Sequence, residues 1–513
     1  MSQQLSAPTN VPGPQAPSST ALRMWLSAYR VEVTLFAVSF FVLAAFSAQR
    51  FWRQSAAPHF VYQAKAMLEG RSDIDVEVLP NFEDWACVRD VGGQKVRCVN
   101  QPLPGDRWYS SFPWFPSVVM LPFVAIHGYQ FNDTSFGVII GALAIALFYA
   151  LLRVLRDTEG TRSTPVNDAL TALALGFGTL AFYAAIRGEV WFSAEVMGIG
   201  FTALYLRNAV GARRPVLAGL FWSMGVLTRT PLLFTGLFFV LEALAPEKGD
   251  RLTQLKTLTP AKKQALGRFV AGAAPLGVIA ALWNFTRFGS FTEFGHRFFF
   301  NNRVNHDIDT FGLFNVHYLT RNLDAAFLKL PVVSQKLLGY DAWGLSLFLT
   351  LPLLALMFVP AEQQKRAVQL LGAMIAVLVA SALFPPLPPP PGEPPIGWRP
   401  VALWLVLALV VAFFAWSAWE WVKSKDAPRL LVPVLLTLLA CMLPGLLYQN
   451  TGYAQFGFRF SLDYTPYLFL LLVLGGWSWK KPLPMTLGLL SLAVGFWGAV
   501  GFRGYTELVH RFP

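Results

Sequence analysis

The stretch PWFPSVVMLPFVAIH, residues 113–127, decides how the fold of this chain is interpreted. It is apolar but only 15 residues long, whereas a helix needs about 20 residues to cross roughly 30 Å of hydrocarbon. It also contains Pro113, Pro116 and Pro122, and a proline inside a helix removes a backbone hydrogen bond. We therefore expect this stretch to lie in the membrane interface rather than to cross the bilayer.

The composition of the whole chain indicates a membrane protein. Of its 513 residues, 55% are hydrophobic and 14% are charged, and the mean hydropathy is +0.47. Because about a quarter of the residues in a soluble domain are charged, this composition excludes an ordinary soluble enzyme and predicts an all-α polytopic membrane protein. The net charge of +12 is divided between the two sides of the membrane, so it does not predict nucleic-acid binding. Three cysteines exclude a disulfide-rich scaffold and a cysteine-based metal cluster.

Besides residues 113–127, the chain contains thirteen apolar runs that we expect to form transmembrane helices. With 113–127 at the surface, the basic short loops at 153–162, 207–214 and 248–268 fall on one side, which the positive-inside rule assigns to the cytoplasm. If 113–127 crossed the membrane, there would be fourteen spans and these loops would face outward. The thirteen runs are 31–49, 135–155, 168–186, 190–208, 215–229, 231–246, 268–288, 342–360, 366–385, 400–422, 429–447, 465–478 and 482–502.

This topology predicts a multi-pass protein of the cytoplasmic (inner) membrane. Residues 1–30 are expected to form a disordered cytoplasmic tail, and residues 31–513 a single transmembrane domain. The amino terminus would lie inside and the carboxyl terminus outside. Two large loops, residues 50–134 and 289–341, would then share the outer face. The first of them begins with a juxtamembrane amphipathic helix from His59 to Gly70, expected to lie on the bilayer.

Carboxylates in the first outer loop are candidates for acid–base chemistry. Asp73, Asp75 and Asp84 follow the amphipathic helix, and Asp84 precedes Trp85. A carboxylate near the membrane surface, partly desolvated by an aromatic neighbour, is suited to act as a general base. The alternative is that these residues are solvated loop charges.

Cations of the outer loops are candidates for binding phosphate. Guanidinium groups at a membrane surface suit a lipid phosphate through bidentate contacts, although they could equally pair with loop carboxylates or headgroups. Arg459 stands among aromatic residues just before an apolar run, a position that requires a partner such as a phosphate or Asp463. The candidate substrate-binding residues are His59, Glu195, Arg229, Arg287, Arg297, Arg303, Arg459 and Asp463.

The sequence favours no metal or cofactor. Cys87 and Cys98 flank a probable hairpin turn at Gly92 and Gly93, and they form either a structural disulfide or two free thiols. The segment containing His306, Asp307 and Asp309 matches no specific metal-ligand spacing, so a divalent metal is not expected there. The expected spans contain few ionisable residues, none of them at mid-membrane, and this pattern disfavours an ion- or proton-coupled transporter.

Several short pieces of the chain resemble the integral-membrane glycosyltransferases of the GT-C type, the group that includes protein O-mannosyltransferases and aminoarabinose transferases. The resemblance covers most of the chain in short, degenerate motifs, and the acidic pair and Pro-Pro-Gly element of the mannosyltransferases are replaced here. By position it favours Asp84 as the base, with Asp73 or Asp75 in reserve. The similar pieces are Leu68-Glu69-Gly70, the segment 109–117 leading into Leu121-Pro122-Phe123, the segment 284–289 with Gly295, and Gly457-Phe458-Arg459-Phe460 with Asp463 and Pro466.

The resemblance implies an inverting transfer of a sugar from a polyprenyl-phosphate donor to an acceptor hydroxyl on the outer face. The donor is itself a lipid, so no nucleotide, cofactor or metal is implied, and the partners would be the bilayer, the donor and an acceptor glycan, glycolipid or protein. Two other classes are a lipid-linked saccharide flippase or transporter, and a non-catalytic membrane scaffold of the same fold.

Overall fold

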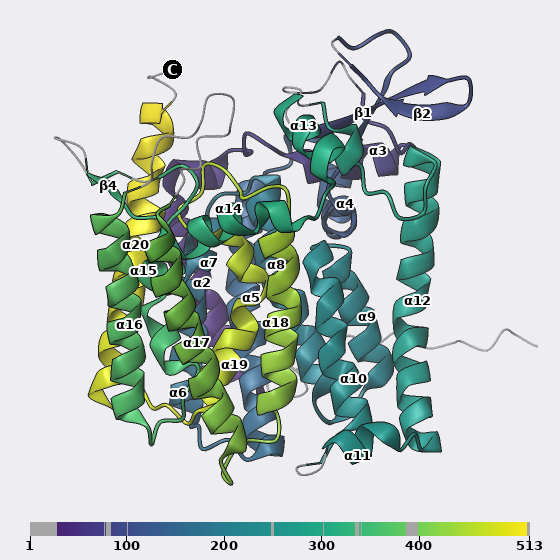
Figure 1. Cartoon of the computed structure of the whole chain (residues 1–513). Coiled ribbons are helices and arrows are strands. Elements are labelled where there is room, and N and C mark those ends of the chain that lie inside the picture. Colours follow the sequence, from purple (N-terminus) through teal and green to yellow (C-terminus); the bar gives the residue numbers. More distant parts are fainter. Residues whose placement is uncertain are drawn as a thin grey trace, which may run out of the picture.

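The protein is mostly helical, and in the described part of the chain six helices are long and apolar enough to cross a membrane (Figure 1). This computed structural model describes residues 28–75, 77, 79, 84–99, 101–247, 251–300, 302–333, 338–339, 341–385 and 399–509, so nearly all of the tail expected over 1–30 lies outside it. By length and composition the chain is a multi-pass membrane protein. The six candidate spans are Arg30–Trp52 (α2 with a following 3-10 turn), α5 (Asp133–Glu159), α12 (Pro260–Phe288), α16 (Gln364–Leu383), α17 (Val401–Lys423) and Pro482–Phe502 of α20 (Pro482–Val509).

The expectation of about thirteen spans was wrong, because several apolar runs are interrupted or shortened. The run 168–186 is divided at Gly178 and Thr179, where the Thr179 side chain accepts a hydrogen bond from the Ala181 amide and starts a new helix. The run 342–360 is broken before Pro352, since proline cannot continue the backbone hydrogen bonding. The resulting pieces are α6 (Pro165–Phe177), α7 (Leu180–Ala185), α15 (Leu347–Thr350) and a 3-10 turn over Pro352–Leu356.

The other apolar runs form helices that are individually short or less apolar. The helix α8 (Val190–Ala209) has 20 residues but includes Glu195 and Arg207, which lower its hydropathy. A hydropathy run therefore overstates the span count wherever a helix ends or carries charge inside the run. The short apolar helices are α9 (Pro215–Val226), α10 (Gly236–Leu244, after a 3-10 turn over Thr230–Thr235), α18 (Leu431–Leu447) and α19 (Thr465–Leu474).

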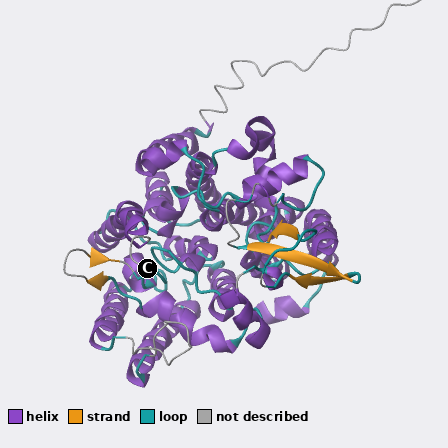
Figure 2. Ribbon diagram, turned by 90° about the horizontal axis from the view of Figure 1, so that it is seen from above, coloured by secondary structure: helices purple, strands orange, loops and turns teal. Residues whose placement is uncertain are grey.

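One end of the helix bundle bears a small sheet and several short helices (upper part of Figure 1; seen from above in Figure 2). Strands β1 (Trp85–Val91), β2 (Gln94–Arg97) and β3 (Arg107–Ser110) are antiparallel in the order β2-β1-β3. Beside them lie α3 (His59–Leu68) and α4 (Phe115–His127). Other short elements are α11 (Arg251–Lys256), at the opposite end of the bundle, α13 (Asn302–Phe311), α14 (Leu319–Leu323) with a π-helical turn Asp324–Leu328, β4 (Val332–Val333) and β5 (Leu338–Gly339).

The decisive stretch 113–127 forms α4, a helix of 13 residues. At 1.5 Å per residue it is about 20 Å long, too short to cross the hydrocarbon. It is viewed nearly end-on in Figure 1, so it runs across the bundle axis. The helix α3 packs against α4 and buries Gln63, whose amide oxygen accepts a hydrogen bond from Ser117 of α4. The polar side of α3 thus contacts protein, not only water.

Two glycines allow α9 and α12 to approach closely. A Cβ atom added to Gly219 of α9 would lie 2.0 Å from the Phe269 carbonyl oxygen, and one added to Gly272 of α12 would lie 2.0 Å from the Val216 carbonyl oxygen. Small residues on facing helices are the usual means by which membrane helices bring their backbones together. This contact attaches α12, which stands at the edge of the bundle, to the rest of the fold (Figure 1).

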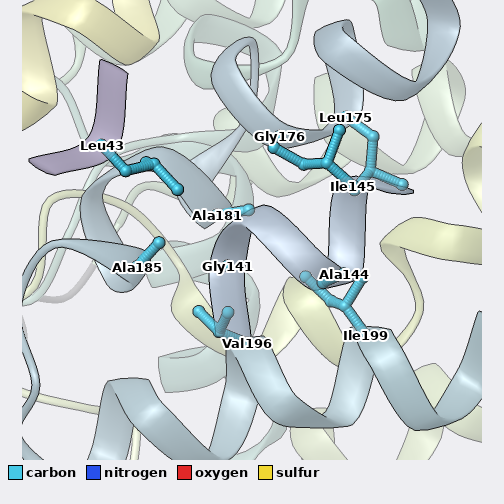
Figure 3. Close-up of a pocket in the computed structure, with 10 residues that line it drawn as sticks. All are labelled: Leu43, Gly141, Ala144, Ile145, Leu175, Gly176, Ala181, Ala185, Val196 and Ile199. Carbon is cyan, nitrogen blue, oxygen red and sulfur yellow. The ribbon is translucent and has the colours of Figure 1, made fainter. Parts of the chain in front are cut away.

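A void of about 10 Å³ lies between α2, α5, α6, α7 and α8 (Figure 3). Its walls are apolar and include Leu43, Gly141, Ile145 and Leu175. A space of this size holds about one water molecule, and these walls offer it no hydrogen-bond partners from side chains. The void is therefore a packing gap rather than a ligand site.

We expect Gly272→Ala to lower the free energy of unfolding by about 1–3 kcal/mol, because the added methyl must push α12 away from α9. Gly277 lies on the same helix with nothing within 4 Å of an added Cβ, so Gly277→Ala is the matched control and should be neutral or slightly stabilising. Thermal unfolding in detergent measures both. Equal effects of the two substitutions would contradict the close helix contact.

Candidate functional site

Four charged residues from three parts of the chain meet at the end of the bundle near the small sheet. Glu195 lies on α8, Arg229 follows α9, and Arg459 and Asp463 bound a 3-10 turn before α19. Arg229 donates to both oxygens of Asp463, from Nε at 2.9 Å and from Nη2 at 2.7 Å. The Glu195 Oε1 atom lies 3.9 Å from Arg229 Nη2 and 3.4 Å from Arg459 Nε. We call these four residues the arginine–carboxylate cluster.

Three members of the cluster are almost fully removed from solvent, and the Arg229 side chain is 16% exposed. The exposed fractions are 1% for Glu195, 8% for Arg459 and 5% for Asp463. Aromatic rings cover the cations: the Phe460 ring centroid lies 5.6 Å from the Arg229 guanidinium and 5.2 Å from that of Arg459. Buried charges are tolerated only when they are paired, so each member of the cluster depends on the others.

The two arginines differ in how their donors are used. Arg229 is held by its bidentate contact with Asp463. By contrast, Arg459 Nε and both Glu195 carboxylate oxygens are buried and make no hydrogen bond in the described part of the structure. Burial lowers the pKa of Arg459, which the neighbouring carboxylates counteract. Arg459 is thus ion-paired, yet it keeps donor capacity for a further anionic group.

Asp84 joins this cluster through Trp191, the residue one helical turn before Glu195 on α8. The Trp191 indole Nε1–H donates to Asp84 Oδ2 at 3.0 Å, and the Ser111 hydroxyl donates to the Asp84 carbonyl oxygen at 3.0 Å. The charge of the Asp84 carboxylate also acts on Arg459. Asp84 is partly exposed, so of the carboxylates that act on Arg459 it is more accessible than the buried Glu195.

The backbone of Asp84 adopts a left-handed conformation, with φ of 59°. Aspartate tolerates this region better than most residues, but the conformation still has to be imposed by its surroundings. Here the chain passes directly into β1, which pairs with β3 from Trp85 opposite Ser110, and Phe300 donates its amide to the Trp85 carbonyl. These contacts determine where the Asp84 side chain lies.

Cys87 and Cys98 form a disulfide between β1 and the residue after β2. The disulfide lies three residues beyond Asp84 and is fully buried against Trp85 and Trp108. Of the described side chains, only these two cysteines with Asp106 have a spacing that would suit a metal ion, and the disulfide removes both thiols from such a role.

His59 contributes to the aromatic wall beside Asp84. Its ring stacks on Trp85 at 4.0 Å and meets Phe112 edge-on at 5.4 Å, and it is 2% exposed. Asp73 is half-buried and Asp75 is exposed, with the Asp75 carboxylate accepting the Glu77 amide. Within the described residues neither reserve carboxylate contacts the arginine–carboxylate cluster.

The arginines of the second outer loop do not gather in this cluster. Arg287 is 1% exposed and donates to the Ser110 carbonyl at 2.9 Å and to Asn284 Oδ1 at 2.9 Å, so its donors are used within the protein. The Arg297 side chain is 74% exposed and lies 3.7 Å from Glu293. The Arg303 side chain lies outside the described part of the structure. Arg287 instead anchors the backbone next to Ser111, which binds Asp84.

The segment with His306, Asp307 and Asp309 forms ion pairs with arginines. Asp307 lies 3.1 Å from Arg321, and Asp309 lies 2.6 Å from Arg97. The hydrogen bonds from Arg97, together with its charge, lower the pKa of Asp309. These pairs attach α13 to the sheet and to α14, which is a structural role.

Trp191 and Ser111 hold Asp84 but were not predicted from the sequence. For Trp191 a signal existed, since it precedes Glu195 by four residues and therefore lies on the same helix face. For Ser111 there was none, because its contact with Asp84 depends on the sheet. Comparison of the chain with protein-family models, curated proteins and solved structures found no match.

Removing one partner of the buried Arg229–Asp463 pair should destabilise the protein strongly. We expect Asp463→Ala to cost about 3–5 kcal/mol of unfolding free energy, because Arg229 would be left buried with only the more distant Glu195. The double variant Arg229→Met with Asp463→Leu should cost less than the single one. Thermal unfolding of both variants in detergent tests this, and an additive loss would refute the pairing argument.

Proposed function

We propose that the protein is a membrane glycosyltransferase that moves a sugar from a polyprenyl-phosphate donor to an acceptor hydroxyl on the outer face of the cytoplasmic membrane. One observation carries this proposal: a partly exposed carboxylate, Asp84, is held by Trp191, one helical turn from Glu195, and Glu195 is the ion-pair partner of Arg459, a cation with unused donors. A base and an anion site in one place are what transfer from a lipid phosphate requires.

In the proposed reaction, Asp84 accepts the proton of the acceptor hydroxyl as the hydroxyl oxygen attacks the anomeric carbon. The new carbon–oxygen bond forms on the face opposite the departing phosphate, so the configuration inverts. The bond between the anomeric carbon and the phosphate oxygen breaks, and its electron pair stays on that oxygen. The guanidinium of Arg459 stabilises the added negative charge, which is larger in the transition state than in the bound donor.

The helix positions agree with the proposed sidedness. Arg153, near the carboxyl end of α5, donates to the Ala28 carbonyl just before α2, and the described part of α20 ends at the end of the bundle that bears the small sheet (Figure 1). The basic loop that holds α11 lies at the end away from the cluster. With that end cytoplasmic, as the positive-inside rule requires, the cluster faces outward.

A saccharide transporter is supported less well by these observations. The void between α2, α5 and α8 has apolar walls, and sugar hydroxyls would lose hydrogen bonds to water there without replacement (Figure 3). The charged residues of the candidate site lie instead at one end of the bundle, where a donor headgroup meets the acceptor.

The transferase proposal predicts that Asp84→Asn lowers kcat by about 10²–10⁴-fold, because the acceptor proton loses its base. Arg459→Ala should lower kcat by about 10²–10³-fold, and Arg459→Lys should restore part of this loss. The measurement is sugar transfer by purified protein in vesicles, with a panel of radiolabelled polyprenyl-phosphate sugars and mixed membrane acceptors.

Asp75→Asn is the control, since Asp75 is an exposed carboxylate of the same loop. It should leave transfer unchanged. Transfer that survives both Asp84→Asn and Arg459→Ala would show that the site is assigned wrongly, and the absence of transfer from every donor in a folded protein would favour a scaffold.

Replacing the indole donor of Asp84 should shift the pH dependence of catalysis. A hydrogen bond from the indole favours the ionised form of the Asp84 carboxylate, so Trp191→Phe should make that form less favourable. The acid limb of kcat/KM would then move to higher pH, because the base becomes protonated earlier as the pH falls. A pH–rate profile with an unmoved acid limb and a uniformly lower rate would indicate a packing defect instead.

A further inference from the structure

Burial raises the pKa of Glu195 to about 8, so above that pH Glu195 is charged and the candidate site carries a negative charge before any ligand binds. The arginine–carboxylate cluster contains two guanidinium groups and two carboxylates, and Asp84 adds a third carboxylate, which leaves one excess negative charge. Glu189, the residue before α8, has cations of its own, Arg187 at 2.8 Å and Arg50 at 3.6 Å. A phosphodiester would bring one more negative charge into this buried region, where uncompensated charge is costly.

Glu195 is the carboxylate that a phosphate would compete with. It is the nearest carboxylate to Arg459, at 3.4 Å, and at 3.9 Å it is only a distant partner of Arg229, which Asp463 already holds. Both of its oxygens are buried and accept no hydrogen bond within the described residues. The Glu195 carboxylate is therefore held by charge interactions alone, whereas the Asp463 carboxylate also accepts hydrogen bonds from Arg229.

We infer that Glu195 is the resident counter-ion of Arg459, that the phosphodiester of a lipid-linked ligand displaces it, and that this binding is accompanied by the uptake of one proton at Glu195. The inference rests on the proposed function in taking Arg459 as the phosphate site. Once the phosphate holds Arg459, a buried carboxylate without its cation takes up a proton, because burial disfavours the charged form. The net charge of the site is then unchanged by binding.

Other ionisable groups around Glu195 are less suited to take up this proton. Arg229 and Arg459 are cations already, and Asp463 keeps its bidentate partner when a ligand binds. Asp84 keeps the Trp191 hydrogen bond. The phenols of Tyr183, from α7, and Tyr448, after α18, lie near Arg459 and Arg229, and both are neutral around pH 7. Cys441 donates its thiol to the Asp463 carbonyl and is also neutral.

The inference predicts a linked pH dependence of binding. The probe is farnesyl methyl phosphate, a phosphodiester whose single charge does not titrate between about pH 5 and 9, so any proton taken up belongs to the protein. Near pH 9, where Glu195 is charged in the free protein, calorimetry in two buffers of different ionisation enthalpy should report an uptake approaching one proton. Affinity should rise up to about tenfold for each pH unit lowered while Glu195 is charged in the free protein.

Near pH 9, where Glu195 of the wild type is charged, Glu195→Gln should bind the probe more tightly than the wild type and without proton uptake, since the competing charge is gone. Glu189→Gln is the matched control, a buried carboxylate at the residue before α8 whose loss should leave the proton uptake unchanged. Weaker binding by Glu195→Gln, or binding to the wild type without proton uptake, overturns the inference. If Glu195→Gln does not fold, the two-buffer calorimetry of the wild type still shows whether a proton is taken up on binding, which tests the inference by itself.

Dimethyl phosphate tests whether the ligand is a lipid. It should take up the same proton but bind at least tenfold more weakly than the farnesyl diester, and equal affinities would overturn the assignment to a lipid-linked ligand. The proton uptake on binding and the sugar transfer are measured separately, so the two results test different proposals. Proton uptake without transfer supports the counter-ion role and refutes the transferase, whereas transfer without proton uptake refutes only the counter-ion role.

Discussion

The buried pairing of Arg229 with Asp463 is the interaction on which the candidate site depends. It joins the end of α9 to the turn before α19, and it brings Arg459 to Glu195 on α8. Taking these charges out of water is expensive, and their mutual attraction offsets that cost only in this arrangement. The position of the site is thus determined by charge compensation, while the apolar helices around it determine only that it lies at one end of the bundle.

A second constraint acts through the backbone of the small sheet. Asp84 occupies a left-handed conformation between residues that the structure does not describe and strand β1, which the disulfide attaches to the residue after β2. Arg287 contributes from the far side by holding the Ser110 carbonyl, next to the serine that binds Asp84. Arg287, a candidate ligand-binding arginine in the sequence, therefore supports the candidate base Asp84 here.

The sequence predicted the membrane class, and it singled out all four residues of the cluster as candidates for substrate binding, a role that stays a prediction, because lone charges beside apolar runs must find partners at helix ends. It also allowed for the Cys87–Cys98 disulfide. It could not predict the number of spans, since hydropathy does not register the break at Gly178 and Thr179 or the one before Pro352. Nor could the sequence distinguish the role of Arg287 from that of Arg459. Arg287 is a buried arginine that binds a carbonyl, Arg459 is one that binds a carboxylate, and the two look alike in sequence.

The distance along the chain between Arg229 and Asp463 has a consequence for biosynthesis. The two partners are separated by 234 residues, so at about 5–20 residues per second the ribosome completes Asp463 roughly 10–50 s after Arg229 has been made. Throughout that interval Glu195, which is synthesised earlier, is the carboxylate of the cluster available to Arg229. Glu195 can therefore pair with Arg229 while Arg229 is newly inserted. Once the last helices are in place, Asp463 pairs with Arg229, and Glu195 becomes the partner of Arg459.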